Sequence, residues 1–217
     1  MTRVLLADDE PVLRAGVAAI LATDPGIEVV AQAGDGREAI ELTTAHRPDV
    51  AVLDVRMPGT DGLTAAAEIH RRTDLHCAVL ILTTFADDDY LTRALTAGAA
   101  GFVLKTGDPR EILDGVRAAA AGAAYLSPRM ARRVLDLYTR TTRHPHAPRA
   151  AIATLTERER TVLGLVGAGL PNAEIGRELH LTEGTIKTHV SAILDRLGAR
   201  NRVQAAIIAH EHHLIPE

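Results

Sequence analysis

Short apolar runs alternate with longer amphipathic stretches through the first 124 residues. The apolar runs lie at residues 3–7, 27–33, 50–54, 78–84 and 100–104. Stretches with a helical period follow them, at residues 12–21, 37–45, 63–72, 90–97 and 111–121. Runs without polar alternation are typical of strands that are buried on both faces of a parallel sheet. The pattern therefore predicts five repeats of strand and helix, a doubly wound parallel sheet with right-handed crossovers.

Three aspartates stand where the predicted strands end. Asp8 and Asp9 follow the first strand, and Asp54 ends the third. In the common strand order 2-1-3-4-5 these two strands are neighbours, and a crevice opens at their carboxyl ends. Carboxylates with room for water suit Mg²⁺, which allows an aspartate to attack a phosphoryl group. Lys105 after the fifth strand and Thr83 at the end of the fourth would add a positive charge and a hydroxyl group.

The pattern changes after residue 124. Ser127 and Pro128 open a predicted helix, and a stretch rich in Pro, Thr, Arg and His follows it. We interpret residues 125–152 as a linker that consists of this helix and a flexible segment.

Residues 153–217 show a helical pattern throughout. Thr156 and Glu159 form a capping box at the start of the first helix. The caps Asn172, Thr182 and Asn201 then open three further helices with short connections. The sequence predicts a small all-α domain of four helices.

Charge separates the two halves of the chain. Residues 1–124 carry 11 Arg and Lys against 19 Asp and Glu, a net charge of −8, whereas residues 125–217 carry 13 against 9, a net charge of +4. A basic second half is compatible with nucleic acid. The single cysteine, Cys77, excludes an internal disulfide. Because no apolar run approaches the roughly 20 residues of a membrane span and no signal peptide is evident, we expect a cytoplasmic protein without a membrane segment.

The motifs ADDE, LDVRMPGTDG, LTT and GFVLK resemble the receiver domain of two-component response regulators over nearly all of residues 1–124. The resemblance implies a flavodoxin-like fold and the Mg²⁺-dependent transfer of a phosphoryl group from a sensor histidine kinase. It identifies Asp54 as the phosphoacceptor and Asp8 with Asp9 as the acidic metal pair. The backbone carbonyl of Arg56 would complete the metal shell.

The same resemblance implies a switch. Thr83 matches the switch hydroxyl, Phe102 the aromatic switch residue and Lys105 the phosphate-binding lysine. We expect phosphorylation to draw Thr83 and Lys105 into new hydrogen bonds, and Phe102 to fill the space that Thr83 leaves. One departure from the receiver pattern is Thr106, because many receivers have proline after the lysine.

Residues 155–206 resemble, nearly end to end, the helix-turn-helix domain of the NarL/LuxR family. The resemblance makes residues 171–180 the supporting helix and residues 182–197 the recognition helix, whose N-terminal half would enter the major groove of DNA. Candidate contacts to bases or phosphates on the recognition helix are Lys187, Thr188, Ser191 and Gly184. Candidate contacts to the DNA backbone are Arg177, Arg196, Arg200 and Asn201.

Together these features predict a response regulator transcription factor, a switch and not an enzyme. Phosphorylation of Asp54 would control binding to double-stranded DNA and homodimerisation through the last helix. One alternative is a constitutive or ligand-gated DNA-binding regulator whose first domain is only a dimerisation scaffold. Another is a hydrolase with Asp54 as nucleophile, which would need a second carboxylate two residues later, where Arg56 stands.

Overall fold

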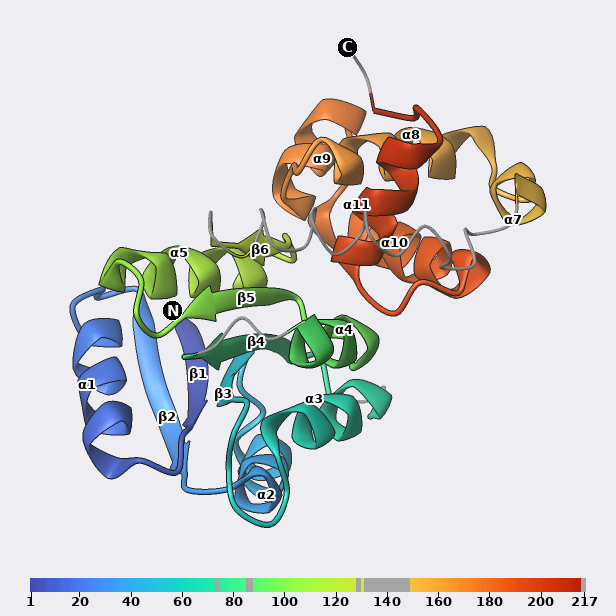
Figure 1. Cartoon of the computed structure of the whole chain (residues 1–217). Helices are drawn as coiled ribbons and strands as arrows, with labels where there is room; N and C mark the ends of the chain where they lie inside the picture. Colours follow the sequence, from blue (N-terminus) through green and yellow to red (C-terminus); the bar gives the residue numbers. More distant parts are fainter. Residues whose placement is uncertain (73–74, 85–87, 128–129, 131–148, 216–217) are drawn as a thin grey trace. The chain divides into compact units, whose positions relative to one another are not determined.

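In the described residues, six parallel strands form one sheet in the order β2-β1-β3-β4-β5-β6 (Figure 1). The computed structural model describes residues 1–72, 75–84, 88–127, 130 and 149–215. The strands are β1 (Thr2–Ala7), β2 (Ile27–Ala33), β3 (Val50–Asp54), β4 (Ala78–Thr83), β5 (Gly101–Leu104) and β6 (Tyr125–Leu126). Every residue of the central strand β3 is buried, as expected for a sheet that is covered on both faces.

In the part of the chain that the structure describes, five helices cover this sheet. They are α1 (Pro11–Leu21), α2 (Gly36–His46), α3 (Gly62–Arg71), α4 (Asp88–Thr96) and α5 (Pro109–Ala120). Helices α1 and α5 contact each other, whereas α3 contacts both α2 and α4 (Figure 1). The predicted flavodoxin-like fold, with order 2-1-3-4-5 in its first five strands, is therefore confirmed.

The sixth strand is an addition to the predicted sheet. Tyr125 pairs with Gly101 and Leu126 with Phe102, so the segment extends the sheet beyond β5. Two residues are too short a run to be recognised as a strand from the sequence pattern. The helix predicted from Ser127 lies almost entirely outside the described residues.

Among the described residues from 149 to 215 there are five helices. They are α7 (Arg149–Ala153), α8 (Glu157–Gly167), α9 (Asn172–Leu179), α10 (Glu183–Leu197) and α11 (Arg202–Glu211). Their core contains Leu163, Ile175, Ile186, Ile193 and Ala209. The predicted helical domain is confirmed, but α7 falls in the segment that we predicted to be a flexible linker. Its Ala151 and Ile152 are partly buried against this core, which gives the short helix a reason to form.

Side-chain caps begin three of these helices as predicted. The Thr156 hydroxyl accepts a hydrogen bond from the Glu159 amide within a capping box, Thr182 caps α10, and Asn201 caps α11. The prediction for α9 is wrong, because Pro171 occupies its N-cap position and Asn172 lies inside the helix. The Asn172 side chain instead accepts a buried hydrogen bond from Arg202, described below.

The chain divides into two compact units, which we describe separately. One comprises residues 1–120 and 125–137, and the other residues 121–124 and 138–217. None of the helices in the described part of the chain is long and apolar enough to span a bilayer.

Candidate functional site

The carboxyl ends of β1 and β3 bring three aspartates together. Ala7 pairs with Leu53 in the sheet, so Asp8 and Asp54, the next residue of each chain segment, lie side by side. Asp8 and Asp54 are 1% and 6% exposed, whereas Asp9 is exposed. One carboxylate oxygen from each of Asp8, Asp9 and Asp54 lies within 4.8 Å of the others. Close carboxylate oxygens of this kind form a donor set that suits a hard divalent cation.

Lys105 supplies a positive charge to this acidic site. Its Nζ atom lies 2.7 Å from Oδ2 of Asp8 and 3.0 Å from Oδ1 of Asp54. The other carboxylate oxygen of Asp8 accepts a hydrogen bond of 3.0 Å from the Glu10 amide. One ammonium group thus pairs with two of the three clustered carboxylates, which leaves negative charge for a metal ion to neutralise.

The burial of these groups shifts their proton affinities. Burial raises the pKa of the Asp54 carboxyl, although the hydrogen bond and charge of Lys105 act in the opposite direction. Burial lowers the pKa of the Lys105 ammonium, but its hydrogen bonds to Asp8 and Asp54 outweigh that effect and leave the pKa raised. The lysine therefore stays charged and paired at neutral pH.

The loop between β3 and α3 packs directly against Asp54. The Gly62 amide donates a hydrogen bond to the Val55 carbonyl, and a Cβ atom at position 62 would lie 1.8 Å from the Asp54 carbonyl oxygen. Only glycine fits there. Our sequence analysis quoted Gly62 within a motif but gave it no role, because a close backbone approach leaves no periodic pattern.

An open pocket of about 420 Å³ adjoins the acidic site. It is lined by Asp9, Val55, Arg56, Met57, Pro58, Asp61, Tyr90 and Arg93. Because Asp9 belongs both to the pocket and to the carboxylate cluster, the pocket borders the cluster at Asp9.

The amphipathic helix α10 presents a polar face. Ile186, Ile193 and Leu197 are buried, and Val190 and Leu194 pack partly against the same core, as predicted. The exposed residues are Glu183, Gly184, Thr185, Lys187, Thr188, Ser191, Asp195 and Arg196. The four predicted base-contacting positions thus lie on the exposed face.

Comparison with known proteins defines the family. Residues 4–117 match the family model "Response regulator receiver domain", and residues 153–209 match "Bacterial regulatory proteins, luxR family". The chain belongs to the NarL/LuxR family of response regulators. It is thus a response regulator transcription factor with a receiver domain and a LuxR-type DNA-binding domain.

Relatives align along nearly the whole chain. The transcriptional regulatory protein LiaR of Bacillus subtilis is 40% identical over 99% of this chain and 100% of its own length. The DNA-binding transcriptional activator DevR/DosR of Mycobacterium tuberculosis is 38% identical over 97% of this chain and 95% of its own. Among solved structures, the response regulator ChrA of a heme-sensing two-component system is 34% identical, covers 99% of this chain and 98% of its own, and has a TM-score of 0.54.

The predicted switch residues Thr83 and Phe102 lie on the neighbouring strands β4 and β5. Thr83 ends β4, next to β3, and is 7% exposed. The Lys105 amide donates a hydrogen bond of 2.8 Å to the Thr83 carbonyl, which ties the ends of β4 and β5 together. Phe102 on β5 is 1% exposed, so its ring is already inside the receiver. The peptide bond between Lys105 and Thr106 is trans.

Polar side chains on the recognition helix make contacts within that helix. Lys187 Nζ lies 3.0 Å from Glu183 Oε1, and the Thr188 hydroxyl donates to the Gly184 carbonyl over 3.1 Å. Both the lysine and the glutamate are largely exposed, so this ion pair is weak and DNA can compete for it.

The predicted contacts to the DNA backbone divide into exposed and buried positions. Arg177, paired with Glu174 over 3.6 Å, and Arg200 are exposed. Asn201 is 4% exposed, and its side-chain oxygen accepts from the Gln204 amide. Because that side chain is buried in the cap of α11, we leave Asn201 out of the proposed DNA contacts.

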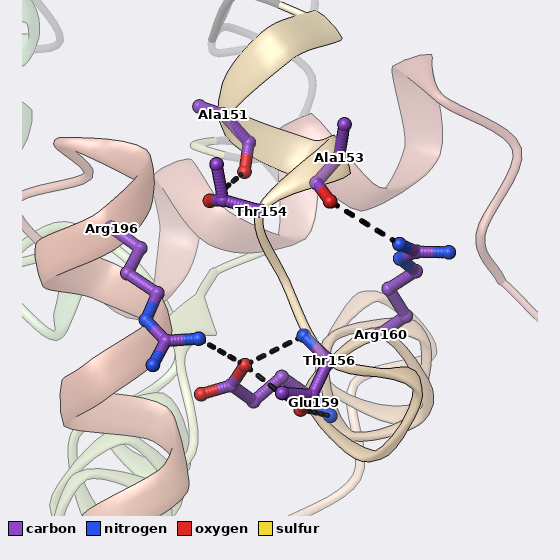
Figure 2. Close-up of polar contacts among 7 residues, drawn as sticks. All are labelled: Ala151, Ala153, Thr154, Thr156, Glu159, Arg160 and Arg196. Carbon is purple, nitrogen blue, oxygen red and sulfur yellow. Dashed lines mark hydrogen bonds and ion pairs between the residues drawn. The ribbon is translucent and has the colours of Figure 1, made fainter.

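Arg196 is held by the capping box of α8 (Figure 2). Its Nη1 atom lies 2.5 Å from Oε2 of Glu159, and the same oxygen accepts from the amide and the hydroxyl of Thr156. The Glu159 side chain is 7% exposed, whereas that of Arg196 is 45% exposed. The arginine therefore links the end of α10 to the start of α8 while part of it still faces solvent.

A buried arginine that the sequence analysis missed links α11 to α9. Arg202 is 7% exposed, and it donates to Asn172 Oδ1 over 2.7 Å and to the Leu170 carbonyl. Burial lowers its pKa to about 10, so the guanidinium remains charged at neutral pH. The only hint in the sequence is a charged residue at the start of a largely apolar helix.

Proposed function

We propose that Asp54 accepts a phosphoryl group from a sensor histidine kinase and that this modification switches DNA binding. The observation that carries the proposal is the juxtaposition of the buried Asp54 carboxylate with Asp8, Asp9 and Lys105. The residues that would hold Mg²⁺ are these three aspartates and the backbone carbonyl of Arg56. Bound there, the ion would neutralise the oxygens of the incoming phosphoryl group.

The transfer is a displacement at phosphorus. A carboxylate oxygen of Asp54 attacks the phosphorus of the kinase phosphohistidine, the P–N bond breaks, and the imidazole leaves with the bonding electron pair and takes up a proton. Lys105 turns from the carboxylates toward the new phosphoryl oxygens. Hydrolysis of the resulting acyl phosphate restores the carboxylate and releases inorganic phosphate, so the chain acts as a timed switch.

The acyl phosphate adds negative charge and acceptor oxygens at the ends of β3, β4 and β5. Thr83 follows Leu82, the sheet partner of Asp54, and would donate its hydroxyl to the phosphoryl group once that strand end moves. Phe102 lies on the adjacent strand and can occupy the space that Thr83 leaves. The phosphoryl group thus favours one of two packings of the receiver surface.

The output is binding of the LuxR-type domain to DNA as a homodimer. Lys187, Thr188, Ser191 and Gly184 form the face of α10 that would enter the major groove, since they are exposed near the start of the helix. Arg177, Arg196 and Arg200 would contact the backbone. A two-fold symmetric dimer would select a pseudo-palindromic operator.

Phosphorylation of Asp54 is tested with the variant Asp54→Asn. We expect the variant to lose Mg²⁺-dependent labelling by a phosphorylated kinase domain while keeping the circular dichroism spectrum of the wild type. Asp35→Asn is the matched control, because Asp35 caps α2 outside the site and asparagine caps a helix equally well. Undiminished labelling of Asp54→Asn would refute the assignment.

A further inference from the structure

Helix α4 contacts the loop that follows Asp54 at two points. The guanidinium carbon of Arg56 lies 5.5 Å from the centroid of the Tyr90 ring. Arg93 Nη2 lies 2.9 Å from Asp61 Oδ2. Tyr90 and Arg93 are three residues apart on α4 and so share one face of the helix. We call these four residues the α4 clasp.

The clasp holds a loop whose two ends are already fixed. At one end Asp54 belongs to β3, and at the other Gly62 packs against the Asp54 carbonyl. Val55 and Met57 are 3% and 8% exposed, so the inner side of the loop is packed as well. Arg56 is exposed, and its guanidinium group lies over the Tyr90 ring of α4.

The clasp also borders the acidic site. Its four residues line the open pocket that contains Asp9, one of the three clustered carboxylates. The loop that carries Arg56 and the helix α4 thus meet in the pocket to which Asp9 also belongs.

We propose that Tyr90 and Arg93 are positioning residues for the Mg²⁺ site, which act by holding the loop that presents the Arg56 carbonyl beside Asp9 and Asp54. The inference rests on the proposed function, because it requires that Mg²⁺ binds there. Mg²⁺ demands near-ideal octahedral geometry with ligand distances of about 2.0–2.1 Å, whereas Ca²⁺ tolerates flexible coordination. A loop that loses its contacts with Tyr90 and Arg93 presents the carbonyl less often in that geometry, so the metal binds more weakly.

The position of α4 and the affinity for Mg²⁺ are then coupled. Because coupling between two equilibria is reciprocal, bound metal stabilises the clasp as much as the clasp favours the metal.

The test is isothermal titration of the full chain with Mg²⁺ alone, for the wild type and four variants. Tyr90→Leu removes the aromatic face, whereas Tyr90→Phe keeps it and is the control. Asp61→Asn and Arg93→Gln each break the ion pair, and asparagine preserves the cap that Asp61 gives to α3. The dissociation constant should rise about two- to five-fold in Tyr90→Leu, Asp61→Asn and Arg93→Gln and stay unchanged in Tyr90→Phe.

The direction in which Arg93→Gln changes the Mg²⁺ dissociation constant distinguishes loss of loop positioning from the electrostatic effect of removing a nearby charge. Loss of a nearby positive charge alone would tighten Mg²⁺ binding, whereas loss of the clasp weakens it. Tighter binding in Arg93→Gln, or unchanged binding in Tyr90→Leu, would overturn the inference while the proposed function stands. A wild-type chain that binds no Mg²⁺ would overturn the inference together with the metal site of the proposed function.

Discussion

At the scale of single residues, the sequence predicted which side chains form the acidic site but not how those side chains pair. Asp8, Asp9, Asp54 and Lys105 were predicted to meet because parallel strands end at one edge of a sheet. The two distances from Lys105 Nζ to Asp8 and Asp54 were not predictable, because side-chain pairing depends on packing that sequence patterns do not encode.

Replacement of Lys105 by methionine should destabilise the metal-free receiver. Asp8 and Asp54 would lose the cation that they share, and breaking a buried ion pair costs about 3–5 kcal/mol. Excess Mg²⁺ should reduce this loss, because it supplies charge to the native state only. Urea denaturation in EDTA and in Mg²⁺ measures the loss in free energy of unfolding without and with the metal. An equal loss in the two buffers would contradict this interpretation.

Replacement of Gly62 by alanine should also destabilise the receiver. The new methyl group would have to displace the Asp54 carbonyl, at a cost of about 1–3 kcal/mol for an overpacked site. It should slow the phosphorylation of Asp54 as well, because the carboxylate moves with its backbone. Gly16→Ala is the control: nothing lies within 4 Å of its added Cβ atom, so this helix position should gain stability. If the two variants were equally stable, the Asp54 carbonyl would be able to move away from the new methyl group at little cost, and the prediction would be wrong.

At the scale of helices and strands, the sequence was most informative where a motif has a local physical cause. The capping box of Thr156 and Glu159 and the caps Thr182 and Asn201 appear as predicted, because each needs only side chains within four residues. Asn172 was assigned as a cap from the same rule and is not one. Its side-chain oxygen accepts a hydrogen bond from Arg202, 30 residues away, and a contact with so distant a partner leaves no local pattern in the sequence.

The capping box of α8 should make the stability of the helical domain depend on pH. Hydrogen bonds from Thr156, together with Arg196, hold the pKa of the Glu159 carboxyl below its ordinary value. A carboxyl with a lowered native pKa contributes stability above its unfolded pKa and loses it as the pH falls through the native pKa. Glu159→Gln keeps the capping geometry but removes the charge, so it should cost about 1 kcal/mol at pH 7 and almost nothing well below about pH 4. Thermal unfolding at both pH values measures this difference, and a cost that does not depend on pH would argue against the ion pair.

The recognition helix gives a prediction about DNA. Lys187→Ala should lower specific affinity by about 1–3 kcal/mol if Lys187 contacts a base. If Lys187 contacts a phosphate, the variant should bind all DNA sequences more weakly by the same factor, and its affinity should depend less on salt concentration. Lys187→Arg is the matched control, since it keeps the charge. Binding isotherms at several salt concentrations distinguish the cases, and an isotherm unchanged by Lys187→Ala would contradict both.

At the scale of the whole molecule, hydrophobic periodicity was enough to predict both architectures. The five predicted strands agree with β1 to β5 to within a residue at each end. Neither β6 nor α7 was predicted, because two and five residues are too few to show a period, and both lie at the ends of the segment that we interpreted as a linker. The composition and charge of the two halves indicated two kinds of partner, but only the motifs identified the family.

The central claim is that phosphorylation of Asp54 switches this regulator between two states. The most direct test measures oligomeric state and binding to a randomised DNA pool, with and without Mg²⁺ and the phosphoryl mimic beryllofluoride, for the wild type and Asp54→Asn. We predict that the wild type gains both dimer and selective DNA binding on addition of the mimic and that Asp54→Asn gains neither. Equal DNA binding by the wild type in both states would contradict the claim and favour a constitutive regulator whose receiver is a dimerisation scaffold.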